Sequence, residues 1–115
     1  QYIVTSQSAP HHGLAVYRAS DGNYVSVFGD PIIFALSRTA NVAYVPKDMG
    51  FNSYNGIQAF TVPGGVFIGD LDPLATDITA IAASPDGHYL GYALSVGTAR
   101  KLRVYDLNLN AVVAE

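Results

Sequence analysis

Apolar and polar positions alternate in short blocks along most of the chain. Apolar, β-branched and aromatic residues come in runs of about four to eight, and glycine, proline, asparagine, aspartate and serine separate these runs. The longer period of an amphipathic helix is hard to find. The pattern is typical of an all-β protein. It predicts strands at residues 2–6, 14–18, 24–28, 32–37, 42–45, 57–62, 66–69, 78–83, 89–94, 102–107 and 111–114.

The segments between the runs have the composition of tight turns. In Ser84-Pro85-Asp86-Gly87 the proline presets φ, the aspartate can accept a bond from the following backbone, and the glycine can take a left-handed conformation. Asp21-Gly22-Asn23 and Pro63-Gly64-Gly65 are of the same kind. These turns predict hairpins, and so antiparallel pairing of consecutive strands.

Three stretches of the chain repeat one design. Residues 14–27, 57–68 and 102–113 each form an apolar strand that ends in an aromatic residue, then a short polar or glycine-bearing turn, then a second apolar strand. The aromatic residues Tyr17, Phe60 and Tyr105 are separated by 43 and 45 residues. A repeat of about 40–50 residues is typical of the blades of a β-propeller.

The last repeat carries motifs of a known kind of blade. Residues 78–93 read Ile-Thr-Ala-Ile-Ala-Ala-Ser-Pro-Asp-Gly-His-Tyr-Leu-Gly-Tyr-Ala, and residues 101–107 read Lys-Leu-Arg-Val-Tyr-Asp-Leu. Over about forty residues this order resembles a blade of the WD-repeat, TolB-like and YVTN-type β-propeller superfamily. The chain has no tryptophan, so it lacks the Trp-Asp dipeptide of strict WD repeats. The resemblance implies a propeller fold, which hosts scaffolds, hydrolases, lactonases and dehydrogenases alike.

Grouped into blades of four strands, the predicted strands number three, four and four. The predicted fold is therefore an all-β β-propeller fragment of antiparallel four-stranded blades. Residues 1–29 would form the last three strands of a partial blade, residues 30–71 a second blade and residues 72–115 a third, all within one propeller domain. Closed propellers have about four to eight blades. We therefore expect either a portion of a larger propeller or a homo-oligomer that is completed by strand exchange.

Charge and composition narrow the possible partners. The net charge is −3, and the six lysines and arginines are scattered, which argues against nucleic-acid binding. The absence of cysteine excludes disulfides, zinc–thiolate sites and thiol catalysis. No apolar run approaches the roughly 18 residues of a membrane span, so we expect no membrane insertion. The cellular compartment stays open.

Two aspartates occupy corresponding places in the repeat. Asp30 and Asp77 each come just before the predicted inner strand of a blade, which would lie near a central channel. Two interpretations are open: the carboxylates could hold a hard cation or a polar ligand, or each could accept backbone bonds in its own turn. The pair His11-His12 has no further ligand at metal-site spacing. No nucleophile motif or phosphate-binding glycine loop is present, so we expect no catalytic residue and no cofactor.

Residues 46–56 form the longest insertion between predicted strands. This segment places Met49, Phe51 and Tyr54 outside the regular strands, and such side chains are enriched at protein contacts. They could bind a protein partner, or they could fold back over their own blade.

The sequence therefore favours a binding or scaffolding module of β-propeller type. Its expected partners are another protein or the remaining blades of the same propeller. One alternative is part of a propeller enzyme, a hydrolase, lactonase or dehydrogenase, with most active-site residues outside this chain. Another is a structural subunit that completes its propeller by self-assembly.

Overall fold

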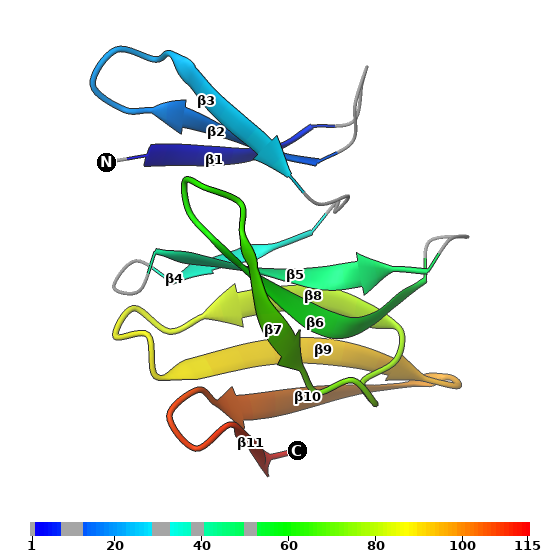
Figure 1. Ribbon diagram of the computed structural model, residues 1–115. Helices are drawn as coiled ribbons and strands as arrows, with labels where there is room; N and C mark the ends of the chain where they lie inside the picture. Colours follow the sequence, from blue (N-terminus) through cyan, green and yellow to red (C-terminus); the bar gives the residue numbers. More distant parts are fainter. Residues whose placement is uncertain (1, 8–12, 29–32, 38–40, 50–52) are drawn as a thin grey trace.

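A computed structural model describes residues 2–7, 13–28, 33–37, 41–49 and 53–115, and every regular element in these residues is a β-strand (Figure 1). The all-β prediction is confirmed. The described strands are β1 (Tyr2–Gln7), β2 (Gly13–Arg18), β3 (Tyr24–Phe28), β4 (Ala35–Ser37), β5 (Val42–Asp48), β6 (Tyr54–Thr61), β7 (Phe67–Leu71), β8 (Ile78–Ala83), β9 (Tyr89–Val96), β10 (Ala99–Asp106) and β11 (Ala111–Ala114).

The strands form three antiparallel sheets that follow one another along the chain. The first sheet has the order β1-β2-β3, the second β4-β5-β6-β7 and the third β8-β9-β10-β11. In Figure 1 the sheets lie one beyond the other, and β4 of the second sheet packs against β8 of the third. This arrangement of one three-stranded and two four-stranded sheets is that of a propeller fragment. Treating the three blades as parts of one domain remains a prediction.

The aromatic residues of the repeat occupy the same place in each sheet. Each of the three comes directly after a β-bulge: Tyr17 on β2, Phe60 on β6 and Tyr105 on β10. β6 and β10 are the third strands of their four-stranded sheets, and β2 holds the corresponding place in the three-stranded sheet. The rings of Tyr17 and Tyr24 meet edge to face with centroids 6.0 Å apart, and those of Phe60 and Phe67 do the same at 5.7 Å. Tyr17, Phe60 and Tyr105 thus hold equivalent positions in their three sheets.

Two hydrophobic clusters hold the sheets together, because alternate residues of a strand point to opposite faces. On β5, Ala43 and Val45 join Leu14 of β2 in a small cluster between the first and second sheets. Tyr44, between them in sequence, joins a larger cluster between the second and third sheets. That larger cluster contains Ala35, Tyr44, Tyr54, Ile57, Ala59, Ala75, Ile78, Leu90, Tyr92, Leu94 and Tyr105. The second and third sheets therefore share a larger buried apolar contact than the first and second sheets do.

Several strand ends differ from the prediction. β6 begins at Tyr54, three residues earlier than expected, and β10 begins at Ala99 instead of Leu102. β9 and β10 continue to a two-residue turn at Gly97, whose φ of 60° suits glycine. The first residues of β10 are exposed and largely polar, so they lack the alternation of apolar and polar positions from which a strand is predicted.

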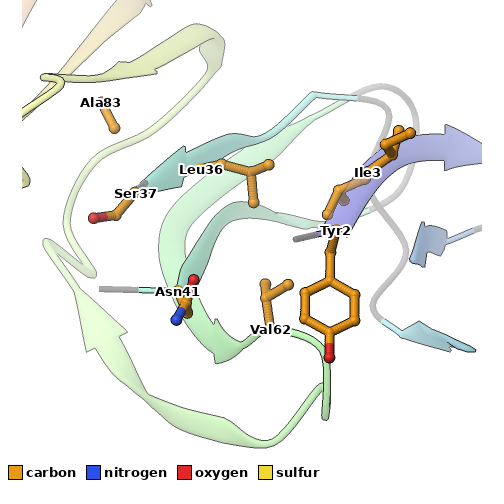
Figure 2. Close-up of a pocket in the computed structure, with 8 residues that line it drawn as sticks. Tyr2, Ile3, Leu36, Ser37, Asn41, Val62 and Ala83 are labelled. Atoms are coloured by element: carbon orange, nitrogen blue, oxygen red, sulfur yellow. The ribbon is translucent and has the colours of Figure 1, made fainter. Parts of the chain in front are cut away.

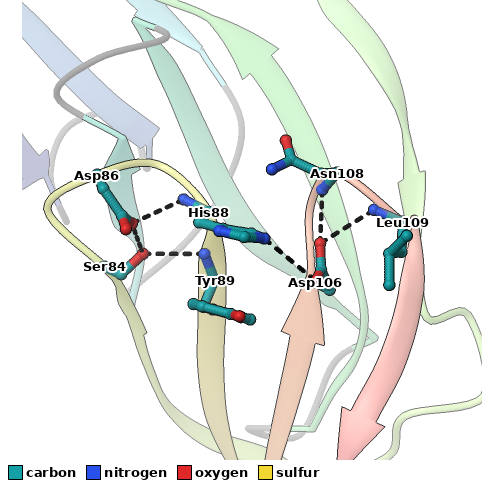
Figure 3. A network of polar contacts seen from close by, with 7 residues as sticks. All are labelled: Ser84, Asp86, His88, Tyr89, Asp106, Asn108 and Leu109. Carbon is teal, nitrogen blue, oxygen red and sulfur yellow. Dashed lines mark hydrogen bonds and ion pairs between the residues drawn. The ribbon is translucent and has the colours of Figure 1, made fainter.

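The turn between β8 and β9 is closed by its own side chains (Figure 3). The Ser84 hydroxyl donates to Asp86 Oδ1 at 2.6 Å and accepts the backbone N–H of Tyr89 at 2.9 Å. Asp86 Oδ1 also accepts the backbone N–H of His88 at 3.0 Å. The Ser84 side chain therefore closes a turn, as its position in Ser-Pro-Asp-Gly indicates.

A buried carboxylate links this turn to the next one (Figure 3). Asp106 Oδ2 lies 3.2 Å from His88 Nε2, while Oδ1 accepts the backbone N–H groups of Asn108 and Leu109 at 2.9 and 3.0 Å. The bonds from Leu109 and Asn108 hold the pKa of Asp106 below its ordinary value of 3.8. The β8–β9 and β10–β11 turns are thereby joined at one end of the third sheet.

We expect Asp106 to make the stability of the fold depend on pH in acid. A carboxyl group whose pKa is lowered by folding stabilises the folded state above its unfolded pKa, and this stabilisation is lost as the pH falls through the folded pKa. The urea midpoint should therefore fall below about pH 4. In Asp106→Asn the urea midpoint should fall less between neutral and acid pH. Part of the fall that remains would come from Asp86, whose pKa is lowered by the bond from Ser84.

The measurement is a series of urea titrations between about pH 7 and pH 3, followed by circular dichroism. Asp70→Asn is the control, since Asp70 is an exposed carboxylate at the opposite end of the sheets. Identical pH profiles for Asp106→Asn and the wild type would contradict the assignment.

Candidate binding face

Described residues of the β5–β6 and β7–β8 connections come together at one end of the sheets. This end lies on the right in Figure 1. The backbone N–H of Gly56 donates to the carbonyl of Ala75 at 2.8 Å, and the N–H of Asp77 donates to Asn55 Oδ1 at 3.0 Å. The N–H of Ser95 donates to the Asp77 carbonyl at 3.0 Å. We call Lys47, Met49, residues 53–56 and residues 70–77 the loop face.

Gly56 allows the two segments of the loop face to approach closely. Its φ is 68°, and a Cβ atom at this position would lie 3.4 Å from the Cα of Pro73. A side chain would be strained there by the backbone conformation, and its Cβ would already touch the β7–β8 connection. The approach explains why an Asn-Gly pair, which usually marks a turn, lies inside β6.

Asp77 has local partners on the loop face. Its φ is 51°, a left-handed conformation that aspartate tolerates better than most residues. The Ser53 hydroxyl donates to Asp77 Oδ1 at 3.3 Å, and Asp77 is exposed. Asp30, the other predicted carboxylate, lies outside the described residues, as do His11 and His12. Within the described ranges, no three His, Cys, Asp or Glu residues are grouped as metal ligands. Cation binding by Asp30 and Asp77 remains a prediction.

The three predicted contact residues have different surroundings. Met49 is 55% exposed at the end of β5. Tyr54 is the first residue of β6, so the expectation that it lies outside the strands is wrong for this residue. Its side chain is buried and belongs to the larger cluster. Phe51 lies outside the described residues. Of the two residues that the structure describes, Met49 is accessible and Tyr54 is not. A role for Met49, Phe51 and Tyr54 in partner binding remains a prediction.

A shallow pocket of about 300 Å³ adjoins Met49 on the loop face. Leu74, which follows the lining residue Pro73 in sequence, is 86% exposed, the most exposed of the large hydrophobic residues described. Sequence reasoning did not single out Leu74, although a leucine after a proline in a polar connection was visible. The pocket is lined by Lys47, Met49, Asn55, Gly56, Asp70 and Pro73. The lining of this pocket thus combines an exposed apolar side chain, Met49, with one lysine and one aspartate.

Comparison with known proteins supports the fold. No family model matches the chain, and no curated protein matches it in sequence. Among solved structures, a chain of Kuenenia stuttgartiensis hydrazine synthase, a β-propeller-containing protein, matches 99% of this chain with a TM-score of 0.64 and 18% identity. The chain has a propeller-type fold.

The chain spans about a third of its structural neighbour, since the match covers 34% of that neighbour's length. At this identity the likeness concerns the fold alone. The propeller-type chain also has no helix, within its described residues, that is long and apolar enough to cross a membrane.

Proposed function

We propose that the chain is a protein-binding module of β-propeller type and that the loop face carries the contact. The observation that supports this most is the exposure of two large apolar side chains on this face: Leu74 at 86%, and Met49 at 55%, which lines a pocket. Exposed apolar residues that are rimmed by polar ones are a common feature of protein contact sites. The resemblance of residues 78–107 to WD-repeat, TolB-like and YVTN-type blades supports the same class, because many such propellers are scaffolds.

The chemistry of the face indicates the kind of partner. Lys47 and Asp70, both exposed, lie on the same pocket as Met49 and Pro73. A partner segment with one apolar anchor, flanked by polar or oppositely charged groups, would cover the methionine and leucine and keep the charges hydrated at the rim. Such a contact depends on a few central apolar residues, while the rim charges mainly affect specificity and association rate.

Substitution of both exposed apolar residues should abolish binding. Peptides selected from a display library on the wild-type chain should bind the variant Met49→Ser/Leu74→Ser at least about thirtyfold more weakly, which corresponds to the roughly 2 kcal/mol of a contact hot spot. The variant should keep its thermal midpoint to within a few degrees, because both side chains are exposed. Binding is measured by calorimetry.

Leu109→Ser is the matched control, since Leu109 is 69% exposed and lies in the β10–β11 turn at the other end of the third sheet. It should leave the affinity of the selected peptides unchanged. Equal binding by the double variant, or equal loss in the control, would remove the support for the loop face.

A further inference from the structure

The outer edge of the second sheet carries three consecutive exposed apolar residues. β7 forms this edge, and no described strand pairs with its outer side. Val66, Phe67 and Ile68 are 60%, 49% and 54% exposed, and we call these three residues the β7 edge. Adjacent apolar side chains beside unpaired backbone groups are the features of an edge that can pair with another strand.

The exposure of the β7 edge is a property of the second sheet itself. This sheet lies between the other two (Figure 1), and an apolar cluster joins it to each of them. The hairpin that leads to β7 is also fixed, because the Ser26 hydroxyl of β3 donates to the Pro63 carbonyl at 2.5 Å. Both faces of the sheet therefore have their neighbours among the described residues, and the β7 edge stays exposed beside them.

The β7 edge also lies away from the larger cavity of the described chain. That cavity has a volume of about 860 Å³ and lies between the first and second sheets, where Tyr2, Leu36 and Val62 border it (Figure 2). No residue of the β7 edge is among its described lining residues. The exposed side chains of the edge are thus turned to the outside of the molecule.

Hydrogen bonds show which backbone groups of the edge point outward. The Val66 carbonyl accepts the N–H of Thr61 at 2.8 Å, and the Val66 N–H donates to Thr61 Oγ1 at 3.0 Å. Because successive residues of an edge strand direct their backbone groups to opposite sides, the N–H and C=O of Phe67 point away from β6. Ile68 has no register partner on β6, so a bulge interrupts the edge there. An added strand can therefore pair at Phe67 but not along the whole of β7.

The sequence around Phe67 reads nearly the same in both directions. Residues 64–70 are Gly-Gly-Val-Phe-Ile-Gly-Asp. In an antiparallel pair of two copies centred on Phe67, phenylalanine faces phenylalanine, Val66 faces Ile68 and glycine faces glycine. The bulky apolar residues of one copy therefore cover those of the other, and such cross-strand pairs stabilise a sheet.

Charge is compatible with the same pairing. Asp70 is the charged residue of this segment, and it would face Gly64 of the second copy. Like charges directly opposite each other destabilise a strand pair, and this register avoids them. A twofold contact uses the same surface on both copies, so a nearly palindromic edge favours a second copy over an unrelated strand.

We propose that β7 pairs antiparallel with β7 of a second copy about a twofold axis at Phe67. The Phe67 residues of the two copies exchange two backbone hydrogen bonds, and Val66 and Ile68 cover each other across the axis. Few residues meet, so the dissociation constant is about 0.1–1 mM. This contact is separate from the loop face.

Sedimentation equilibrium of the whole chain across this concentration range should show the mass rising from that of the monomer toward that of the dimer. Phe67→Lys and Phe67→Glu should each associate at least about tenfold more weakly, because like charges then face each other on the axis. An equimolar mixture of the two variants should regain association, since lysine faces glutamate only if residue 67 lies on the axis. Circular dichroism verifies that both variants are folded.

Cross-linking tests the axis without a charge. The chain has no cysteine, so Phe67→Cys introduces a single thiol. The proposed pairing brings the two Cα atoms to about 5.5 Å, which suits a disulfide. Phe67→Cys should therefore oxidise to a covalent dimer at least about tenfold faster than Val113→Cys, whose site is 48% exposed on the outer strand of the third sheet.

Two further variants locate the contact. Val113→Lys and the loop-face variant Met49→Ser/Leu74→Ser should both associate as the wild type does, which separates this proposal from the proposed function. A monomer mass at every concentration, no recovery in the mixture of Phe67→Lys and Phe67→Glu, or equal cross-linking at positions 67 and 113 would each overturn the proposal. Loss of association in Val113→Lys or in the loop-face variant would place the contact elsewhere and would overturn it as well.

Discussion

Leu90→Ala should lower the free energy of unfolding by about 3 kcal/mol, whereas Ile3→Ala should lower it by less than about 1 kcal/mol. The two residues occupy the same position of the repeat, opposite Tyr105 and Tyr17. Leu90 is fully buried in the larger cluster, so alanine leaves a cavity that rigid neighbours cannot fill. Ile3 is half exposed and loses little contact. The difference would measure what a neighbouring inner strand adds at this position.

Urea denaturation followed by tyrosine fluorescence provides both values. Ala43 holds the same position in the second sheet, opposite Phe60, and Ala43→Gly is a further check. Loss of its fully buried methyl group, together with the poor fit of glycine in a strand, should lower the free energy of unfolding by about 1 kcal/mol. Equal losses in Leu90→Ala and Ile3→Ala would mean that the first sheet is already covered at Ile3 in solution.

The strands were predictable because their signal is local. The bounds of β3, β8 and β11 match the predicted ranges, since each is bordered by turn residues such as Gly22 or Gly87. The start of β6 was missed because tertiary contacts define it. Asn55 and Gly56 become part of a strand when the β7–β8 connection bonds to them. No pattern along the chain contains that information.

The candidate sites depended still more on distant contacts. Burial of Tyr54 and exposure of Leu74 follow from how sheets and connections pack, so a loop methionine and a loop tyrosine looked alike in the sequence. Ile3 illustrates the same limit, because its sequence position is that of an ordinary core residue. Only the strand registers show that its counterparts are covered while it is not.

The polar cluster around Asp72 is another feature that the sequence of the β7–β8 connection does not reveal. Asp72 follows β7, yet its carboxylate accepts bonds from the Tyr92 hydroxyl and from Arg103 Nη1, the latter at 2.9 Å. Arg103 Nη2 donates to Glu115 Oε1 at 2.6 Å. Burial, and then the bond to Asp72, raise the pKa of Tyr92, so its hydroxyl stays protonated as the donor. The cluster ties the β7–β8 connection to the face of the third sheet.

We expect Asp72→Asn to lower the free energy of unfolding by about 2 kcal/mol. Asparagine tolerates the left-handed backbone at this position, where φ is 44°, so the substitution removes the charge without adding strain. The Asp72 and Arg103 side chains are only 9% and 19% exposed, and water cannot fully replace the lost carboxylate. Arg103 Nε is already buried without an acceptor among the described residues, which makes the guanidinium sensitive to further loss.

Denaturation of three further variants tests the charge pairing. Asp72→Asn/Arg103→Met should regain part of the lost stability, because the uncompensated cation is removed with its partner. Asp21→Asn is the control: it breaks a pair of the same 2.9 Å length with Arg18, but both side chains are about half exposed, and the change should stay within about 0.5 kcal/mol. Arg103→Met alone should be less stable than the wild type. If the double variant were less stable than both single variants, the side chains would be acting through packing alone, and the ion pair would not be what fastens the connection to the third sheet.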